Sequence, residues 1–318
     1  MKPTVLITGG NGFIGRKLTD ALLQAGFQVR ITSRREPKTQ PANPAVRVVR
    51  VDYNNVPSLQ KAMEGCEGVF NLAAAIFGFS RADFERANGG AAQYAVAAAN
   101  QTPGLITLLH VSSLAASGYA ADKNHPRTEA AEPKPVSAYG ITKLGGEKAV
   151  KTLKPGIKWT IIRPPIVYGK NDSGVSKIAA WVKRGLMVNT SGNGFFSFVH
   201  VDDLVRALVT AYERPDTGGE TYFVCDEHIY SWDSFITQMA AAMGVKKPFM
   251  PSAPQWLMRV AAFIYETAAR ISGAEPALNY DKVTEAVIPG LWICRGKKLT
   301  ALPGQTFSAL PEGLKKSF

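Results

Sequence analysis

Residues 4–15, TVLITGGNGFIG, combine a short apolar run, a glycine-rich turn and the start of a helical pattern. The apolar run predicts a buried strand over Thr4–Thr8, and the helical pattern covers residues 14–25. Glycines at such a junction allow a tight turn and close approach of the backbone, while the helix N-terminus offers free N–H groups to a pyrophosphate. The turn therefore predicts a dinucleotide site whose contacts are Gly9, Gly12, Phe13, Ile14 and Gly15.

Strands and helices continue to alternate through the first half of the chain. Apolar runs predict further strands at residues 28–32, 46–50, 68–71, 105–111 and 158–163, and helical patterns include residues 84–99 and 138–152. Strands that alternate with helices build a parallel sheet with crossover helices on both faces. The sequence therefore predicts an α/β fold with a Rossmann-type, doubly wound parallel sheet.

After Arg163 the pattern changes to shorter elements among loops rich in glycine and proline, which indicates a smaller C-terminal lobe. We assign residues 1–165 to a dinucleotide-binding Rossmann domain and residues 166–318 mainly to a substrate-binding lobe. Residues 196–215 are expected to return to the first domain, because residues 198–214 have the pattern of a strand end followed by a helix. An amphipathic helix is expected over residues 256–271, where it either covers the site or packs the lobe.

The charge balance favours small anionic ligands. Lys and Arg together number 37 against 25 Asp and Glu, a net charge of +12, and a basic surface attracts anions such as nucleotides. The sequence has no dense Lys/Arg cluster and no basic stretch interleaved with aromatic residues. We therefore expect no nucleic-acid partner.

Cysteine and histidine usage argues against metal and disulfide chemistry. Cys66, Cys225 and Cys294 are far apart without CxxC spacing, and the four histidines are scattered, so we expect no metal site and a reduced compartment. The N-terminus shows no secretory leader, and charged residues interrupt the apolar stretch 256–271 well short of a membrane span. These features predict a cytoplasmic protein without a transmembrane segment.

The end of the second predicted strand, Thr32-Ser33-Arg34-Arg35, indicates which dinucleotide is preferred. A carboxylate at this place would accept hydrogen bonds from the ribose 2′-hydroxyl of NAD. Arg34 and Arg35 would instead pair with a 2′-phosphate, and Ser33 could donate a further hydrogen bond. We therefore expect NADP(H) to be preferred over NAD(H); the alternative is that one or both arginines lie on a solvated turn.

Tyr139 and Lys143 lie four residues apart where a helix is expected to start. At about 3.6 residues per turn, the two side chains share one face of that helix. A nearby ammonium stabilises a phenolate and lowers the pKa of a phenol from about 10. Tyr139 could then act as a general acid or base, although a Tyr and Lys at this spacing are on their own usually a surface pair.

A set of motifs gives this pair its context. TGGNGFIG (8–15), VDY (51–53), NLAA (71–74), HVSS (110–113), YGITK (139–143), RPPIVYG (163–169) and FVHVDDL (198–204) follow one another in order. The chain thereby resembles the extended short-chain dehydrogenase/reductase superfamily, which includes nucleotide-sugar epimerases, dihydroflavonol reductases and 3β-hydroxysteroid dehydrogenases. The resemblance covers residues 4–215 and is loose beyond them.

The resemblance implies a role for individual residues. Ser113 would hydrogen-bond the substrate carbonyl, Tyr139 would transfer the proton, and Lys143 would hold the nicotinamide ribose and keep Tyr139 acidic. Ser113 is preferred to Ser112 because its distance from the strand end matches the family's catalytic Ser/Thr. Asp52 would meet the adenine, and the remaining cofactor contacts would be Tyr53, Asn71, Leu72, Ala73, Ala74 and Pro164. The resemblance also suggests a homodimer through the helices at residues 84–99 and 138–152.

Three functions remain open on the sequence alone. The first is an NADP(H)-dependent oxidoreductase that reduces a ketone or oxidises a secondary alcohol. The second is a nucleotide-sugar epimerase or dehydratase, whose relatives usually place a basic residue before the HVDD stretch; residues 192–198 contain none. The third is a catalytically silent NADP(H)-binding regulator, a class that often lacks the Tyr or the Lys present here.

The substrate is expected to be a largely apolar small molecule. Phe195, Phe196 and Phe198 precede the HVDD stretch, and Ile76, Phe77 and Phe79 follow the NLAA turn. Within the helix expected after residue 256, Trp256, Leu257, Val260, Ile264, Ala268 and Ile271 recur at helical spacing. The first two stretches would lie near the nicotinamide end if the resemblance holds, and the helical run could cover the site; the alternative is that these residues fill the core of the second lobe.

Overall fold

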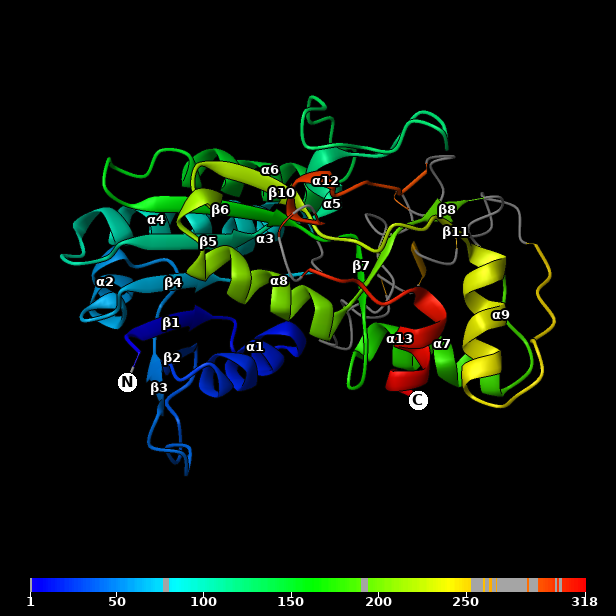
Figure 1. Ribbon diagram of the computed structural model, residues 1–318, viewed down its shortest axis with the longest axis horizontal. Helices are drawn as coiled ribbons and strands as arrows, with labels where there is room; N and C mark the ends of the chain where they lie inside the picture. Colours follow the sequence, from blue (N-terminus) through cyan, green and yellow to red (C-terminus); the bar gives the residue numbers. More distant parts are fainter. Residues whose placement is uncertain are drawn as a thin grey trace.

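The computed structural model describes residues 2–76, 80–189, 194–252, 260, 263, 264, 267, 285, 291–300, 302 and 305–318. Its centre is a seven-stranded sheet in which every neighbouring pair is parallel, in the order β10-β6-β5-β4-β1-β2-β3 (Figure 1). These strands are β1 (Thr4–Thr8), β2 (Gln28–Ser33), β3 (Val46–Arg50), β4 (Gly68–Asn71), β5 (Thr107–Val111), β6 (Lys158–Arg163) and β10 (Glu220–Phe223). The predicted α/β fold with a doubly wound parallel sheet is confirmed.

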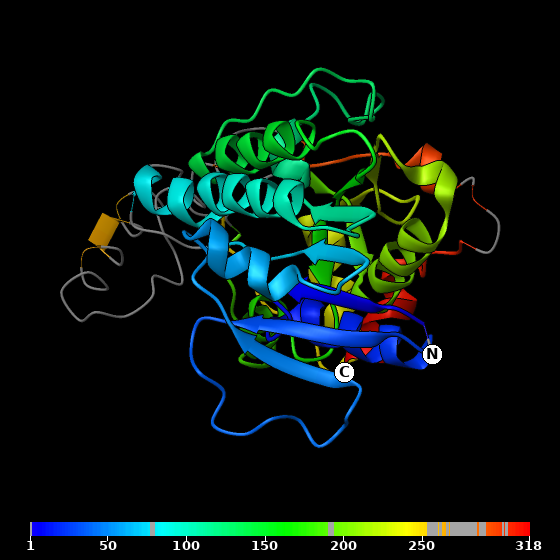
Figure 2. The same ribbon diagram turned by 90° about the vertical axis from the view of Figure 1, so that its left-hand side faces the viewer.

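Helices cover both faces of this sheet, and each face has its own apolar core. One layer holds α1 (Phe13–Gln24) and α8 (Val201–Glu213), whose buried leucines meet apolar side chains of β1 and β2. The other layer holds α2 (Val56–Met63), α4 (Ala91–Gln101) and α6 (Ala138–Val150). Figure 2 shows α4 and α6 side by side above the sheet, with α1 on the opposite side.

The observed elements differ from the predicted ones mainly at their ends. The strand predicted from residue 105 starts at Thr107, and the helix predicted over residues 84–99 is divided into α3 (Arg81–Phe84), a π-helical segment (Glu85–Gly90) and α4. The side chain of Asn88 is buried in this π-helical segment, where it accepts a hydrogen bond from Ala75 N and donates one to Ala75 O. Sequence periodicity does not report such hydrogen bonds between separate segments, so the interruption of the helix was not predicted.

Within the described residues, the C-terminal lobe contains two small sheets and, besides α8 (Val201–Glu213), three longer helices. Its strands are β7 (Ile166–Tyr168) paired with β9 (Phe198–His200), and β8 (Phe195–Phe196) paired with β11 (Tyr230–Ser231). The helices α7 (Ser173–Lys183), α9 (Trp232–Ala242) and α13 (Leu310–Ser317) enclose an apolar core that includes Phe196 and Phe198. Short elements elsewhere in the described residues are α5 (Leu114–Ser117), a 3-10 turn (Pro215–Thr217) and α12 (Lys297–Thr300).

Two segments from the second half of the chain pack with the first domain. α8 lies against α1, and β10 extends the main sheet beside β6, although the division at residue 165 places β10 with the substrate-binding lobe. Parallel pairing gives β10 backbone partners that its own sequence cannot reveal. No helix in the described part of the chain is both long and apolar enough to cross a bilayer.

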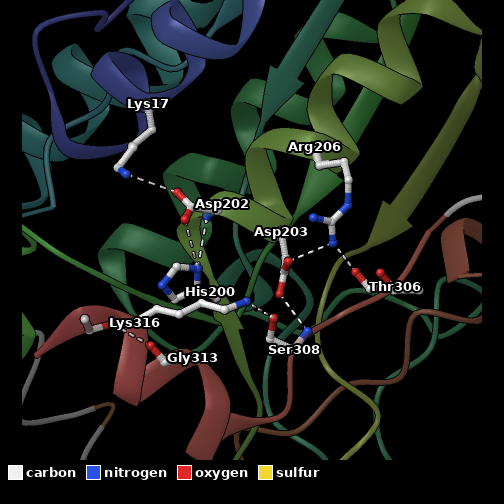
Figure 3. A network of polar contacts seen from close by, with 10 residues as sticks. Lys17, His200, Asp202, Asp203, Arg206, Thr306, Ser308, Gly313 and Lys316 are labelled. Atoms are coloured by element: carbon white, nitrogen blue, oxygen red, sulfur yellow. Dashed lines mark hydrogen bonds and ion pairs between the residues drawn. The ribbon is translucent and has the colours of Figure 1, made fainter.

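Polar contacts hold the C-terminal segment against α8 (Figure 3). The carboxylate of Asp203 accepts hydrogen bonds from Ser308 N at 2.7 Å and from the guanidinium of Arg206 at 2.7 Å. Asp202 forms an ion pair of 3.2 Å with Lys17 of α1. The first turn of α8 thus contacts both α1, through Lys17, and the C-terminal segment, through Ser308.

Candidate active site

The turn between β1 and α1 can be built only from glycine at several positions. Gly9 has a φ of +71°, and a Cβ there would lie 3.0 Å from Ala73 N. A Cβ on Gly15 would lie 2.3 Å from Gly9 O, and one on Gly10, which was not among the predicted contacts, 2.6 Å from a side-chain carbon of Ile31. The glycines therefore close the turn tightly against the neighbouring strands.

The start of α1 suits an anionic group. Gly12 precedes the helix and supplies no side-chain cap, and the first turn holds no acidic residue. By contrast, Asn55, Ser137 and Asp172 cap α2, α6 and α7 with side-chain oxygens. The N–H groups around Phe13 and Ile14 are thus left to a ligand at the positive end of the helix dipole, which fits a dinucleotide pyrophosphate.

Thr8 joins the glycine turn to the loop after β4. Its hydroxyl accepts hydrogen bonds from the N–H groups of Leu72 and Ala73, each at 3.0 Å, and donates to Asn71 Oδ1 at 2.7 Å. The Asn71 amide also lies 3.1 Å from Nδ1 of His110 on β5. The predicted contacts Asn71 to Ala74 therefore lie beside the glycine turn, at the point where the strand order reverses between β1 and β4.

The residues expected to meet the adenine end of the cofactor lie at the carboxyl ends of β2 and β3. Arg34 and Arg35 are exposed there, and Ser33 Oγ accepts a hydrogen bond from Arg35 N at 3.2 Å. Asp52 is exposed and accepts from Asn54 N at 2.9 Å, while the Tyr53 hydroxyl lies 2.6 Å from the Thr32 hydroxyl. Both arginines are thus solvent-accessible cations directly after β2.

The helix that carries Tyr139 and Lys143 is α6, and Ser137 caps it by accepting a hydrogen bond from Gly140 N at 3.0 Å. Lys143 is buried, and its Nζ donates to Val111 O at the end of β5 at 2.6 Å. α5, which begins directly after Ser113, packs so closely on α6 that a Cβ on Gly140 would lie 2.4 Å from Ala115 O. Tyr139 and Lys143 therefore come from α6. Ser113 lies after the end of β5, at the cap of α5, which contacts α6.

The model of the NAD dependent epimerase/dehydratase family matches residues 5–225. This chain belongs to that family. The match includes the glycine turn, α6 and the HVDD stretch, so the resemblance predicted from the motifs is confirmed.

Relatives within and around the family include reductases. The chain is 27% identical over 309 residues to 4-hydroxy-2-methyl-3-oxo-4-farnesyl-3,4-dihydroquinoline-1-oxide ketoreductase of Stigmatella aurantiaca, covering 87% of this chain and 88% of that one. It is 30% identical over 247 residues to ceramide reductase of Caulobacter vibrioides, covering 76% and 71%. A third relative, y4nG of Sinorhizobium fredii, is 33% identical over 214 residues, and the alignment covers 65% of this chain but only 53% of that protein.

Solved structures of sugar-nucleotide enzymes share the fold. The structure of MoeE5 in complex with UDP-glucuronic acid and NAD superposes with a TM-score of 0.76 at 23% identity, covering 99% of this chain and 97% of that one. This chain therefore shares the fold of that structure.

In this epimerase/dehydratase family member, the two adjacent serines after β5 have different environments. Ser112 is buried and donates a hydrogen bond of 2.5 Å to Glu147 Oε1. Ser113 is partly exposed, and its hydroxyl oxygen accepts a hydrogen bond from Ala115 N at 3.1 Å but has no other partner in the described part of the chain. A hydroxyl in this state can still donate its proton to a ligand, which favours Ser113 over Ser112 as the substrate contact.

Glu147 extends the functional face of α6 by one turn. Tyr139, Lys143 and Glu147 are spaced by four residues, and Glu147 forms a buried ion pair with Arg163 at the end of β6. Sequence reasoning missed Glu147, although its spacing from Lys143 was a usable signal. Pro164, a predicted cofactor contact, directly follows Arg163 and accepts a hydrogen bond from Leu114 N at 2.9 Å.

Burial changes the titration of this helix face. Desolvation lowers the pKa of Lys143 to about 8, and the carboxylate of Glu147 opposes that shift. Desolvation, with the Lys143 charge as a smaller cause, also holds the pKa of His110 well below its usual range. His110 is therefore a neutral partner of Asn71, and Lys143 carries the positive charge nearest to the active face at neutral pH.

The C-terminal lobe approaches the start of α6 through Glu285. Ser137 Oγ donates a hydrogen bond to Glu285 Oε1 at 2.6 Å, and Trp292 Nε1 donates to Glu285 O at 2.8 Å. The ring of Trp292 also meets that of Tyr119 edge to face, with centroids 6.2 Å apart. Glu285, which the sequence did not predict as a site residue, thus contacts the cap of α6 two residues before Tyr139.

The apolar residues expected near the nicotinamide differ in burial. Phe196 and Phe198 are buried in the core of the C-terminal lobe, where Phe198 stacks on Phe235 at 4.7 Å, so the alternative reading of these residues was correct. Ile76, Val260 and Ile264 are exposed. Phe77, Phe79, Gly192, Asn193, Trp256, Leu257, Ala268 and Ile271 lie outside the described residues. In the described part of the chain, no three His, Cys, Asp or Glu side chains cluster as a metal site requires.

Proposed function

We propose that this chain is an NADP(H)-dependent oxidoreductase that reduces a ketone or oxidises a secondary alcohol on a largely apolar substrate. The observation that carries the proposal is the accessible Ser113 hydroxyl at the start of α5, packed against the helix that bears Tyr139 and the buried Lys143. In this proposal residues 1–165, together with residues 196–215, bind the cofactor, and residues 166–318 mainly bind substrate.

The three catalytic residues have distinct tasks in the reductive direction. The bound nicotinamide supplies the hydride for the carbonyl carbon. Ser113 donates a hydrogen bond to the carbonyl oxygen, and Tyr139 gives that oxygen its proton. The ammonium of Lys143 stabilises the phenolate left on Tyr139 and binds the nicotinamide ribose. In the oxidative direction the same phenolate accepts the proton of the alcohol.

The preference for NADP(H) rests on the end of β2. Arg34 and Arg35 are exposed where a 2′-phosphate would lie, and no carboxylate follows that strand before Glu36. Guanidinium groups bind phosphate through charge-assisted hydrogen bonds. NAD(H), which has a hydroxyl in place of this phosphate, gains nothing from these two cations.

The apolar character of the substrate rests on two supports. Tyr119 and Trp292 place aromatic rings near the start of α6, and the Glu285 carboxylate there repels an anionic ligand. The names of two relatives specify reduction of a farnesyl-bearing compound and of ceramide, both with long hydrocarbon parts. A nucleotide sugar would need cations to bind its diphosphate instead.

A substrate screen with competition tests the proposal. Purified protein with NADPH is assayed against long-chain ketones, ketosteroids, flavonoid-like ketones and nucleotide sugars, and UDP is added as a competitor. We expect turnover of at least one apolar ketone without inhibition by UDP. Micromolar inhibition by UDP without ketone turnover would assign the chain to the nucleotide-sugar epimerases or dehydratases; NADPH binding without turnover of any class would support a silent regulator.

A further inference from the structure

Two backbone segments of the C-terminal lobe pair to form an apolar ribbon, defined here as residues 185–189 and 249–252. Phe249 N donates to Gly185 O at 2.9 Å, Met187 N donates to Phe249 O at 3.0 Å, and Asn189 N donates to Pro251 O at 2.9 Å. Leu186 pairs with Phe249 and Asn189 with Ser252 in parallel register. The ribbon follows α7 and α9, which Figure 1 places at the end of the molecule away from β3.

The ribbon is apolar on both faces, which is unusual for a surface element. Met187 and Met250 point inward and pack against the lobe's core. On the opposite face, Phe249 is 71% exposed, Leu186 49% and Val188 43%. The side chains of a strand normally alternate, with apolar ones toward the core and polar ones toward solvent. Three large apolar residues on the solvent face therefore indicate a surface that has a partner.

Cations flank the outward face. The segments that lead into the two paired strands of the ribbon carry four exposed cations, Lys183, Arg184, Lys246 and Lys247. The guanidinium of Arg184 lies 5.0 Å from the centroid of the Trp181 ring, and Trp181 is 51% exposed. Of these four cations, only Lys247 has a carboxylate partner among the described residues, namely Asp233. The sequence has no Asp or Glu from residue 173 to 201 or from 234 to 265.

This combination selects one kind of partner. A second copy of the chain on the same face would bring like charges together across a self-complementary interface. A nucleic acid would leave Leu186, Val188 and Phe249 without a matching apolar surface. The surface of an anionic bilayer satisfies both properties, because its head groups attract Lys and Arg while aromatic and aliphatic side chains enter the boundary with the acyl chains.

We propose that the apolar ribbon, with Trp181 and the flanking cations, docks this protein reversibly on anionic lipid membranes. The docking is peripheral, and it is a function separate from the redox chemistry proposed above. An oxidoreductase held in this way would meet apolar substrates at the membrane, where such molecules accumulate.

Vesicle co-sedimentation of the full chain tests the docking without substrate or cofactor, so its outcome is independent of the proposed reaction. We expect binding to vesicles that contain phosphatidylglycerol, weak binding to phosphatidylcholine alone, and release by added salt. Phe249→Ser and Leu186→Ser should each weaken binding about tenfold. Lys183→Gln combined with Lys246→Gln should weaken it about fivefold per cation.

Matched variants far from the ribbon separate docking from general effects. Ile106→Ser removes an equally exposed apolar residue next to β5, and Lys38→Gln combined with Lys61→Gln removes two exposed cations; all should bind vesicles as the unaltered protein does. Equal vesicle binding by the ribbon variants and these controls would overturn the proposal. Two other results would also overturn it. If Phe249→Ser changed the mass found by sedimentation velocity without lipid, the occupant of the ribbon would be a second copy of the chain. If the ribbon variants lost binding to DNA or RNA while no form of the protein bound vesicles, the partner would be a nucleic acid.

Discussion

The carboxylate of Glu147 binds the guanidinium of Arg163 through two hydrogen bonds of 2.8 and 2.5 Å, and the two side chains are only 1% and 3% exposed. The Ser112 hydroxyl donates to the same carboxylate. Through Ser112 and Arg163, Glu147 joins α6 to the carboxyl ends of β5 and β6. Glu147 lies one helical turn after Lys143, and its two partners directly precede Ser113 and Pro164 in the sequence. It therefore positions the elements that carry the proposed catalytic and cofactor contacts.

Replacing Glu147 by Gln should destabilise the fold strongly. The variant leaves the charge of Arg163 buried without a counter-charge, and breaking a buried pair on one side costs about 3–5 kcal/mol. Denaturant unfolding measures this loss. Glu213→Gln is the matched control, because Glu213 pairs with Lys2 at an exposed site, where such a pair contributes at most about 1 kcal/mol. Equal losses for the two variants would contradict the importance assigned to the buried pair.

The exchange Tyr139→Phe should abolish most turnover and leave NADPH binding nearly unchanged. It removes the transferable proton but keeps the ring, whose centroid lies 6.1 Å from that of Phe84. General acid–base catalysis contributes roughly 10²- to 10⁴-fold, so activity within a factor of about 10 of the unaltered enzyme would refute the assigned role. Lys143→Ala should impair both turnover and cofactor binding, as measured by steady-state kinetics and NADPH fluorescence.

Arg34→Ala should weaken the binding of NADPH and leave that of NADH unchanged. The lost charge-assisted contact with the 2′-phosphate corresponds to about 1–3 kcal/mol. Fluorescence titration with both cofactors measures the difference. Arg47→Ala removes an exposed arginine of β3 and serves as control. If the unaltered protein binds NADH as tightly as NADPH, the proposed cofactor preference is wrong.

Asp226→Asn should make the protein more stable at neutral pH. Burial raises the pKa of Asp226 from 3.8 to about 6, so the folded state binds more protons than the unfolded state between these values. The free energy of unfolding of the unaltered protein should therefore fall as pH rises from about 4 to about 6, and the variant should lack this fall. Above that range the advantage of the variant should be about 3 kcal/mol.

Asp216→Asn should change the pH dependence of the free energy of unfolding in the opposite direction. The Arg214 guanidinium lowers the pKa of this exposed carboxyl, so its contribution is present above the usual Asp pKa and is lost as pH falls. Unfolding measured across the acidic range distinguishes the two variants. A parallel response of both variants to pH would contradict the burial effect at Asp226.

The groove between α4 and α6 should form a homodimer interface. It has a volume of about 530 Å³, and three of its lining residues, Ala97, Gly145 and Ala149, are small enough to permit close approach of a second helix pair. A Cβ at Gly145 would meet nothing within 4 Å, so Gly145→Arg should fold and yet give a monomer in sedimentation velocity. Ala241→Arg on the exposed side of α9 should keep the mass of the unaltered protein. A monomeric unaltered protein would refute the expected dimer.

Local sequence patterns were sufficient for the parallel sheet, because each signal lies within a few residues of the element it predicts. β1, β3, β4 and β6 have the predicted bounds, since apolar runs bounded by turn residues report burial directly. The spacing of Tyr139 and Lys143 likewise placed both side chains on one helix face. The motif order was enough to assign the family, because it reports the order of the strand ends that line the cofactor.

Tertiary structure alone decided the features that depend on partners distant in sequence. Ser112 and Ser113 are adjacent and chemically identical, and only the buried Glu147–Arg163 pair distinguishes the engaged hydroxyl from the accessible one. β10 joins the main sheet through backbone hydrogen bonds with β6, and Phe198 lies in the lobe core because α9 covers it. The outward face of the apolar ribbon results from pairing two segments about sixty residues apart. Such contacts depend on long-range packing, which the periodicity of a single segment does not encode.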